Sequence, residues 1–296
     1  MANRRVLVKR RNAARNIRKI TRTMQLIATA RFQAAYSRAS AGKPYTEKLA
    51  KLADDLAQAT GGAGGTDHPL KRPADDSDRS ALLIITSTRG LCGGYNANVL
   101  RVAGEEFDRH TESDTAIDIY MVGKKGLGYY DFKRRSIHSR LTEFGEMPRF
   151  DQIEPLANEL MKRFIDGEIG AASVAYMKFI STGKQQAVVE QVLPIVQTKA
   201  SNDEVTHNLT GVDYEFSPDP QQLLNELLPA TVRVKLFQYF SDAAVSEQVA
   251  RMVAMKAATD AAEDMIKLLT QQYNRARQTH ITMELLDIIG GAEALE

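Results

Sequence analysis

Residues 245–273 read VSEQVARMVAMKAATDAAEDMIKLLTQQY, and this stretch decides the fold. Apolar or small side chains recur in it at alternating spacings of three and four residues, which is the period of one face of a helix. The positions are Val245, Val249, Met252, Thr259, Ala262, Ile266, Leu269 and Tyr273. Because a seam of about two residues per heptad is narrow, it predicts a helix that pairs with one partner helix.

The helical pattern extends far on both sides of this stretch. We expect it to begin near Pro220 and to run from Gln221 to Ile289, roughly 100 Å at 1.5 Å per residue. Pro229 is a candidate kink near its start, because proline removes a helical hydrogen bond.

A second long helix is predicted at the other end of the chain, from Val6 to Gln58, roughly 75 Å on the same rise. Its expected seam follows a similar spacing and consists of Ile17, Ile20, Met24 and Ile27. Since each terminal helix has one narrow seam, we expect the two helices to form a long antiparallel coiled coil, a rod.

The middle of the chain has a different pattern. Buried strands are expected at residues 81–86, 116–122, 172–180 and 187–196, with helices at 96–110 and 152–164. Strands that alternate with helices predict a Rossmann-like α/β domain with a mainly parallel sheet, which would form the foot of the rod. The expected organisation is a coiled-coil helix at 1–60, a linker at 61–80, the α/β domain at 81–200, a linker at 201–219 and a coiled-coil helix at 220–296.

The charge of the chain is distributed unevenly, although the net charge is only +2 over 296 residues. Twelve Lys and Arg residues precede the first acidic residue, Glu47. Such a basic helix calls for an anionic partner, so a nucleic-acid-binding protein remains an alternative function.

The sequence shows no recognisable catalytic, cofactor or metal site. A single cysteine, Cys92, excludes an internal disulfide, and we expect it to be a buried small residue rather than a nucleophile. The five histidines lack metal-ligand spacing, and both the G-x-G-x-x-G and the G-x-x-x-x-G-K-[ST] patterns are absent. No apolar run approaches the roughly 20 residues that cross a bilayer.

Three motifs make the prediction specific. They are IRKITRTMQLIATAR at 17–31, STRGLCGGYN at 87–96, and SEQVARMVAMKAAT at 246–259, the last continued by YNRARQ at 273–278, ITME at 281–284 and GGAEAL at 290–295. Together they closely resemble the gamma subunits of F-type ATP synthases, and the resemblance covers the whole chain in order. Thr88, where an acidic residue is common in that family, and Asp260 are modest departures.

This resemblance implies a non-catalytic rotor shaft, one copy per complex, inside a ring of alternating alpha and beta subunits. The foot would contact the epsilon subunit and the membrane c-ring, so that proton or sodium flow is coupled to ATP synthesis. It further implies a bacterial protein at the cytoplasmic face of the cell membrane, peripheral and not inserted, with no cofactor and no nucleic acid.

The resemblance also assigns residues. Coupling and ring contacts carry over to Met24, Arg251, Gln278, Thr282 and Glu284. An electrostatic band that would face an acidic loop of the beta subunits consists of Lys256, Lys267, Arg275 and Arg277. An apolar tip suited to a bearing consists of Leu285, Leu286, Ile288 and Ile289.

Overall fold

The computed structural model describes residues 4–59, 68–71, 79–113, 115–195 and 220–293. The chain divides into two compact units, a smaller one of Met1–Ala30 with Arg251–Glu296 and a larger one of Arg31–Ala250. Most of the predicted linker 61–80 and all of the linker 201–219 lie outside the described residues, so the predicted domain boundaries stay predictions.

Two long helices enclose the other elements in sequence, and both contribute to both units. They are α1 (Arg4–Ala59) and α5 (Pro220–Glu293), close to the predicted bounds, with Pro44 inside α1 and Pro229 inside α5. Between them lie η2 (Pro69–Lys71), β1 (Arg79–Ile85), α2 (Tyr95–Glu112), β2 (Ala116–Val122), α3 (Lys124–Phe132), β3 (Ser139–Leu141), α4 (Phe150–Ile165), β4 (Ala171–Ser181) and β5 (Lys184–Leu193).

The larger unit contains a five-stranded sheet in the order β3-β2-β1-β4-β5. Strands β1, β2, β3 and β4 run parallel to one another, while β5 is antiparallel to β4. The α/β class and the mainly parallel sheet are thus confirmed. Helix α3 and strand β3 were not predicted, because α3 is a nine-residue helix with two internal glycines and β3 has only three residues.

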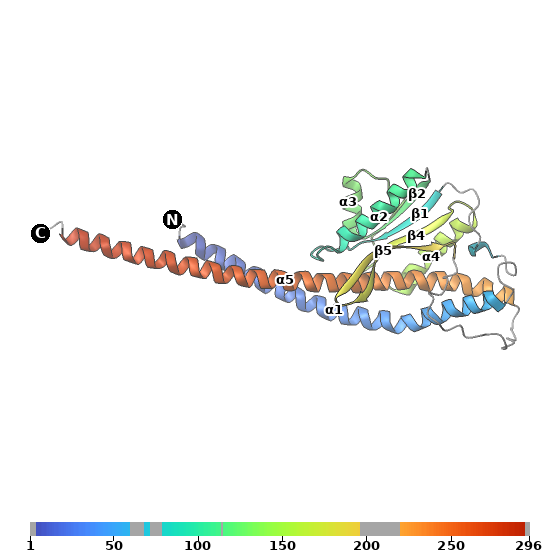
Figure 1. The fold of residues 1–296 in the computed structure, drawn as a ribbon, viewed down its shortest axis with the longest axis horizontal. Helices are drawn as coiled ribbons and strands as arrows, with labels where there is room; N and C mark the ends of the chain where they lie inside the picture. The colour runs from blue at the N-terminus through green and yellow to red at the C-terminus, as the bar shows by residue number, and fades with distance from the viewer. Residues whose placement is uncertain (1–3, 60–67, 72–78, 114, 196–219, 294–296) are drawn as a thin grey trace. The chain divides into compact units, whose positions relative to one another are not determined.

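Helices cover both faces of this sheet (Figure 1). On β1, Leu82 and Ile84 face a core shared with α2 and α3. The alternate side chains Ala81, Leu83 and Ile85 face a second core, to which α4 and the larger unit's parts of α1 and α5 contribute. The period of two along a strand therefore builds a three-layer domain.

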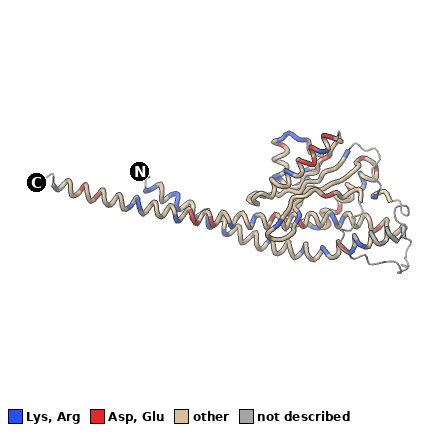
Figure 2. Tube along the Cα trace, in the orientation of Figure 1, with Lys and Arg blue, Asp and Glu red and all other residues tan. Residues whose placement is uncertain are grey.

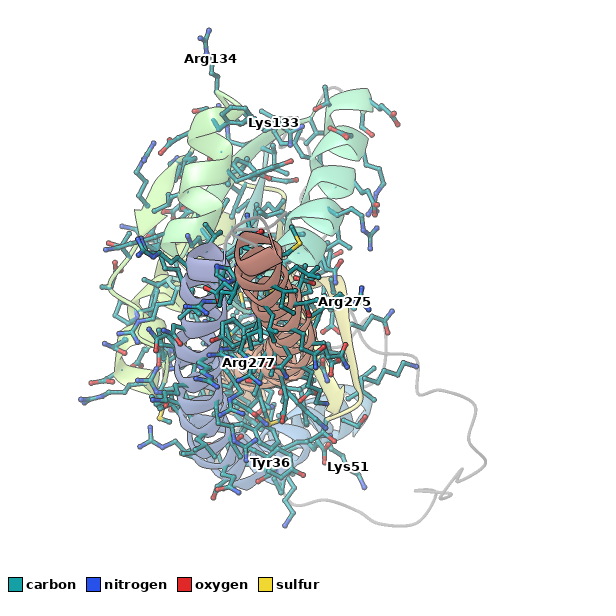
Figure 3. The ribbon with its side chains drawn as sticks, turned by 90° about the vertical axis from the view of Figure 1, so that its left-hand side faces the viewer. Tyr36, Lys51, Lys133, Arg134, Arg275 and Arg277 are labelled. Atoms are coloured by element: carbon teal, nitrogen blue, oxygen red, sulfur yellow. The ribbon has the colours of Figure 1, made fainter. Side chains whose placement is uncertain are left out.

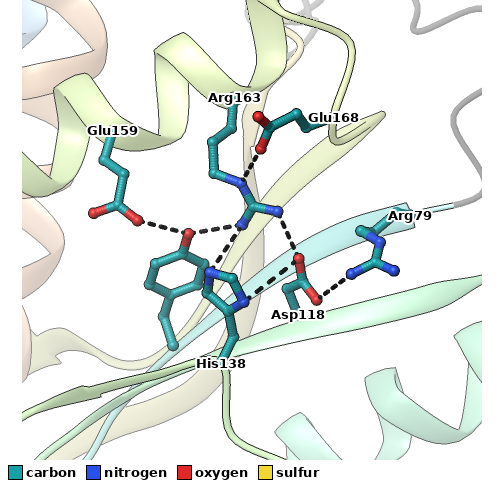
Figure 4. Close-up of polar contacts among 7 residues, drawn as sticks. Arg79, Asp118, His138, Glu159, Arg163 and Glu168 are labelled. Carbon is teal, nitrogen blue, oxygen red and sulfur yellow. Dashed lines mark hydrogen bonds and ion pairs between the residues drawn. The ribbon is translucent and has the colours of Figure 1, made fainter.

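A polar network joins α4 to β2 at the edge of the second core (Figure 4). The Arg163 guanidinium donates to Asp118 Oδ2 at 2.6 Å, to Tyr120 Oη at 2.8 Å and to Glu168 Oε2 at 2.8 Å. Tyr120 in turn donates to Glu159 at 2.9 Å, and its burial raises the pKa of the phenol to about 12. The network satisfies a carboxylate, Asp118, that the fold buries.

The motif at 87–96 forms the turn from β1 into α2. Asn96 Oδ1 accepts a hydrogen bond from the Ser87 N–H at 2.9 Å, and Gly93 has a positive φ of 56°. Cys92 is buried, as expected. At the next strand end Gly123 has a φ of 88°, and a Cβ there would lie 2.2 Å from the Thr86 carbonyl oxygen, so glycine is required.

Glu146 ties this turn to α1 inside the larger unit. Its carboxylate pairs with Arg31 of α1 and, at 3.3 Å, with Arg89 of the turn. The carboxylate side chain is largely buried, so the pair connects the helix to the α/β domain by more than apolar packing.

In the smaller unit, residues 4–30 of α1 pair with α5 from Arg251 onward. Arg11 stacks on Tyr273 at 4.9 Å, Arg18 lies 4.0 Å from Glu263, and the hydroxyl of Thr21 meets that of Thr259 at 2.8 Å. Rising numbers on α1 meet falling numbers on α5, which confirms the antiparallel pairing.

The predicted seam of α1 is wrong. Ile17, Ile20 and Ile27 are exposed, and Met24 is only half-buried. The buried positions are instead seven residues apart, namely Leu7 followed by the small residues Ala14, Thr21 and Ala28. Small side chains let the helix axes come close, and a seven-residue repeat keeps them on the partner.

The predicted seam of α5 is confirmed. In the smaller unit Thr259, Ala262 and Leu269 are buried, and Met252, Ile266 and Tyr273 are half-buried. In the larger unit Val245 and Val249 are both fully buried.

Candidate functional site: the surface of the paired terminal helices

Most of the predicted site residues lie on the exposed surface of α5 in the smaller unit. Exposed are Lys256, Lys267, Arg275, Arg277, Gln278, Thr282 and Glu284. Two depart from this: Met24 on α1 is half-buried and Arg251 is only 6% exposed.

The four predicted cations do not form one stripe. Lys256 and Lys267 are eleven residues apart, about three helical turns, and therefore share a face. Arg275 and Arg277 are two residues apart and leave α5 on different sides (Figure 3). The Lys267 ammonium lies 3.3 Å from Asp264, an exposed pair that adds little stability and leaves the lysine available to a partner.

The basic start of α1 adds to this positive surface. Lys and Arg follow one another along its first residues (Figure 2). The described acidic residues of the smaller unit all lie on α5, where Glu263 forms an ion pair with Arg18. The surface of the unit is therefore mixed in charge near the pairing and more basic along α1.

Beyond the start of α1, helix α5 has no partner helix among the described residues. Every residue from Arg277 to Gly291 is exposed. The Thr282 hydroxyl donates to the Gln278 carbonyl at 3.0 Å, which places these two residues on one face, while Glu284 pairs with His280 at 3.1 Å. The predicted apolar tip is likewise open to solvent, with Ile288 71% exposed.

An open groove of about 920 Å³ lies where α1 begins against α5. Arg4, Arg5 and Leu7 line it from α1, while α5 contributes candidate residues Arg275 and Glu284 among others. It brings cations from both helices close to the carboxylates of Glu284 and Asp287. Of the predicted site residues, the groove brings Arg275 and Glu284 together near the end of the pairing, whereas Arg277, Gln278, Thr282 and Arg251 do not line it.

The start of the third motif has a structural role. Ser246, Glu247 and Gln248 are buried in the larger unit, and the Ser246 hydroxyl donates to the Met177 carbonyl of β4 at 3.1 Å. A polar sequence there reflects packing of α5 against the sheet.

One set of surface residues was assigned to the wrong place by the sequence. Ile17, Ile20 and Ile27, which were predicted to lie in the seam, expose apolar side chains on the surface of α1. Their presence in a motif beside the seven-residue repeat of small residues was the signal that could have identified a second apolar face. Contiguous exposed apolar side chains mark a surface for another protein.

Neither a metal centre nor a membrane span emerges from the part of the chain that the structure describes. No cluster of three or more His, Cys, Asp or Glu side chains there could hold a metal ion. None of the described helices combines the length and the apolar character that crossing a bilayer requires.

Comparison with known proteins identifies the family. A family model described as ATP synthase matches residues 3–295. The ATP synthase gamma chain of Rhodopirellula baltica is 45% identical over 300 residues, which is 100% of both chains. That of Frankia casuarinae is 38% identical and covers 97% of this chain and 96% of its own. None of these names points to nucleic-acid binding.

Solved structures agree at the level of the fold. A chain of the Euglena gracilis mitochondrial ATP synthase, solved as OSCP/F1/c-ring, has a TM-score of 0.63 at 16% identity and covers 99% of this chain and 94% of its own. A chain of the rotor of the same enzyme has a TM-score of 0.61 at 16% identity, with 94% and 98% covered. Because the family model and the similarity to gamma chains both extend over essentially the full length, this chain belongs to the ATP synthase gamma chain family.

Proposed function

We propose that the chain is the rotor shaft of an F-type ATP synthase, the central stalk that passes rotation of a membrane c-ring to catalytic beta subunits. The observation that carries the proposal is the antiparallel pair of α1 and α5 in the smaller unit, whose outer surface exposes apolar and charged side chains that no described residue covers. Full-length similarity to gamma chains supports it.

The shaft acts by contact rather than by chemistry. It can drive a beta subunit from one nucleotide affinity to another only if it contacts the two conformations with different free energies. The paired helices offer such a difference, because Ile17, Ile20 and Ile27 stand on α1, whereas Lys256 and Lys267 stand on α5. Rotation then presents two unlike faces in turn.

Individual residues have distinct parts in this proposal. Lys256 and Lys267 attract an acidic loop of the beta subunits over several ångströms, without a fixed bidentate bond that would hold the rotor. Gln278, Thr282 and Glu284 contact the ring of alpha and beta subunits near the apolar tip of α5. Leu285, Leu286, Ile288 and Ile289 form a bearing, since dispersion contacts are weakly directional.

The remaining parts of the proposal follow from this role. The chain is non-catalytic, binds no cofactor, and occurs once per complex with the alpha, beta and epsilon subunits and the c-ring. It is peripheral at the cytoplasmic face of a bacterial membrane. Recovery of a tagged chain from its native membranes tests these points, because alpha and beta subunits with ATPase activity should be recovered with it. Recovery of nucleic acid instead would refute the proposal.

The coupling role is tested with Gln278→Ala, since Gln278 is exposed and its loss should not disturb folding. Arg251→Ala is less suitable, because Arg251 is buried. We expect the variant complex to assemble and hydrolyse ATP, while gradient-driven ATP synthesis per ATP hydrolysed falls several-fold. Gln222→Ala, at an exposed position of α5 in the larger unit, is the matched control. Unchanged coupling in Gln278→Ala would remove this residue from the proposed contact.

A further inference from the structure

Helix α3 carries an exposed aromatic and basic ridge in the larger unit, whereas the proposed coupling surface belongs to the smaller unit. Lys125, Tyr129 and Phe132 are spaced by four and three residues, so they lie on one face of the helix. All three are exposed, and Phe132, at 83%, is the most exposed large apolar side chain that the structure describes. Tyr129 and Phe132 are neighbours on this face, and adjacent exposed apolar side chains, unlike a single one, mark a surface for another protein.

Two further cations follow Phe132 directly in the sequence. Lys133 and Arg134 are exposed, and neither forms an ion pair with a described residue. The nearby carboxylates are already engaged: Asp131 accepts two hydrogen bonds from Arg140, at 2.5 and 3.1 Å, and Asp108 accepts one from Arg135 at 3.3 Å. The ridge therefore offers positive charge that no carboxylate among the described residues neutralises.

The turn after α3 is held in one conformation. The N–H groups of Lys133, Arg134 and Arg135 donate to carbonyls of residues 129–131 at 3.0 to 3.1 Å. The Arg135 guanidinium stacks on Phe107 at 4.1 Å, and Arg134 has a positive φ of 54°. Figure 3 shows Lys133 and Arg134 extending outward from the end of α3. Because this backbone is already ordered, the ridge itself loses little conformational entropy when a partner binds.

We propose that this ridge, formed by Lys125, Tyr129, Phe132, Lys133 and Arg134, binds a short acidic polypeptide segment of another subunit. The segment carries carboxylates on both sides of an apolar side chain that covers Phe132. From Lys125 to Phe132 the helix rises roughly 10 Å, so the carboxylates stand about two helical turns apart.

Other anionic partners fit the ridge less well. Single-stranded nucleic acid is bound along a positively charged groove, whereas this surface is the convex side of a short helix. Recognition of anionic lipid usually involves roughly four to eight clustered cations, and the ridge has three. The inference rests on the proposed function in one respect: on a rotor, a segment held here belongs to a subunit that turns with the shaft.

The test places a photo-crosslinking benzoylphenylalanine at Phe132 in the complete complex. After irradiation we expect one dominant crosslink, to a segment of a complex subunit with carboxylates flanking an apolar residue. Charge reversal by Lys133→Glu with Arg134→Glu should lower the crosslink yield at least five-fold. Lys48→Glu with Lys51→Glu, the same change at two exposed lysines of α1, should leave the yield unchanged.

The outcomes separate the inference from the proposed function. The inference would be overturned by a crosslink to lipid or to nucleic acid, or by the absence of any crosslink. It would also be overturned if the charge reversal left the crosslink yield unchanged. Absence of alpha and beta subunits from the purified complex would instead overturn the proposed function. Circular dichroism of each variant chain confirms that a lost crosslink does not reflect unfolding.

Discussion

Asp242 is a half-buried carboxyl group of α5, partly removed from water. It lines a cavity of about 330 Å³ between α1, β4, β5 and α5, all in the larger unit. Burial raises its pKa to about 6, although the Gln238 amide donates to it at 2.9 Å and the cations of Lys43 and Lys178 act in the opposite direction. Glu190, which also faces the cavity, repels it.

The raised pKa has a definite consequence for stability. Between its usual value of 3.8 and about 6, the folded chain keeps a proton on Asp242 that the unfolded chain has released. Unfolding is therefore favoured as the pH rises through this window. Asp242→Asn should abolish the effect, with the variant about 3 kcal/mol more stable at pH 7.5 and nearly matched to the native chain at pH 4. Urea unfolding at both pH values tests this, with exposed Asp260→Asn as the control.

Arg163 illustrates a buried charge whose loss is costly. Its side chain is 13% exposed and that of Asp118 is 10% exposed. Arg163→Met should lower the free energy of unfolding by about 3 kcal/mol, because it leaves Asp118 with the more exposed Arg79 as its nearest cation. Adding Asp118→Asn should cost less than the two single changes together, as a double-mutant cycle measured by urea unfolding would show. Additive effects would mean that the two side chains do not interact.

At the scale of the element, the pairing of α1 with α5 depends on side-chain size. Ala14 is 2% exposed against α5, while its neighbour Ala13 is exposed. Ala14→Leu should therefore lower the free energy of unfolding by about 1–3 kcal/mol, because the larger side chain forces the helices apart. Ala13→Leu, the same change one position away, should stay within about 0.5 kcal/mol. Equal effects of the two substitutions on thermal unfolding would contradict the seam.

The same elements show what the sequence can and cannot predict. The bounds of α1, α5 and β2 follow closely from periodicity, because long regular patterns leave few alternatives. The seam of α1 does not, since Ile17, Ile20 and Ile27 have helical spacing on a face that the chain itself leaves open. Periodicity identifies an apolar face but not the molecule that covers it.

The predicted site shows the same limit. A family motif places Gln278 and Thr282 together on α5, and the structure agrees, because one helix fixes both. The burial of Arg251 could not be read from its motif, since it depends on how α5 packs. The ridge on α3 was missed for a third reason, as that helix is too short to show a clear period.

At the scale of the whole molecule, the chain presents two kinds of apolar surface, one buried and one exposed. One is closed within the chain, where Ala14, Thr21 and Ala28 permit close helix pairing. The other stays open on α1 and at the end of α5, and in the proposed function the ring of alpha and beta subunits covers it. The isolated chain should therefore tolerate polar substitutions on the open face that the assembled complex does not tolerate.

Ile20→Gln tests this division directly, because Ile20 is 60% exposed and glutamine is a good helix former. The free energy of unfolding of the isolated chain should change by less than about 0.5 kcal/mol. Affinity for the alpha and beta subunits should fall about ten-fold or more, since burial of an isoleucine contributes about 1.5–3 kcal/mol. Ile165→Gln, at a 52% exposed position at the end of α4, should leave that affinity unchanged. If Ile20→Gln assembled as tightly as the native chain, the open face of α1 would have no part in holding the shaft.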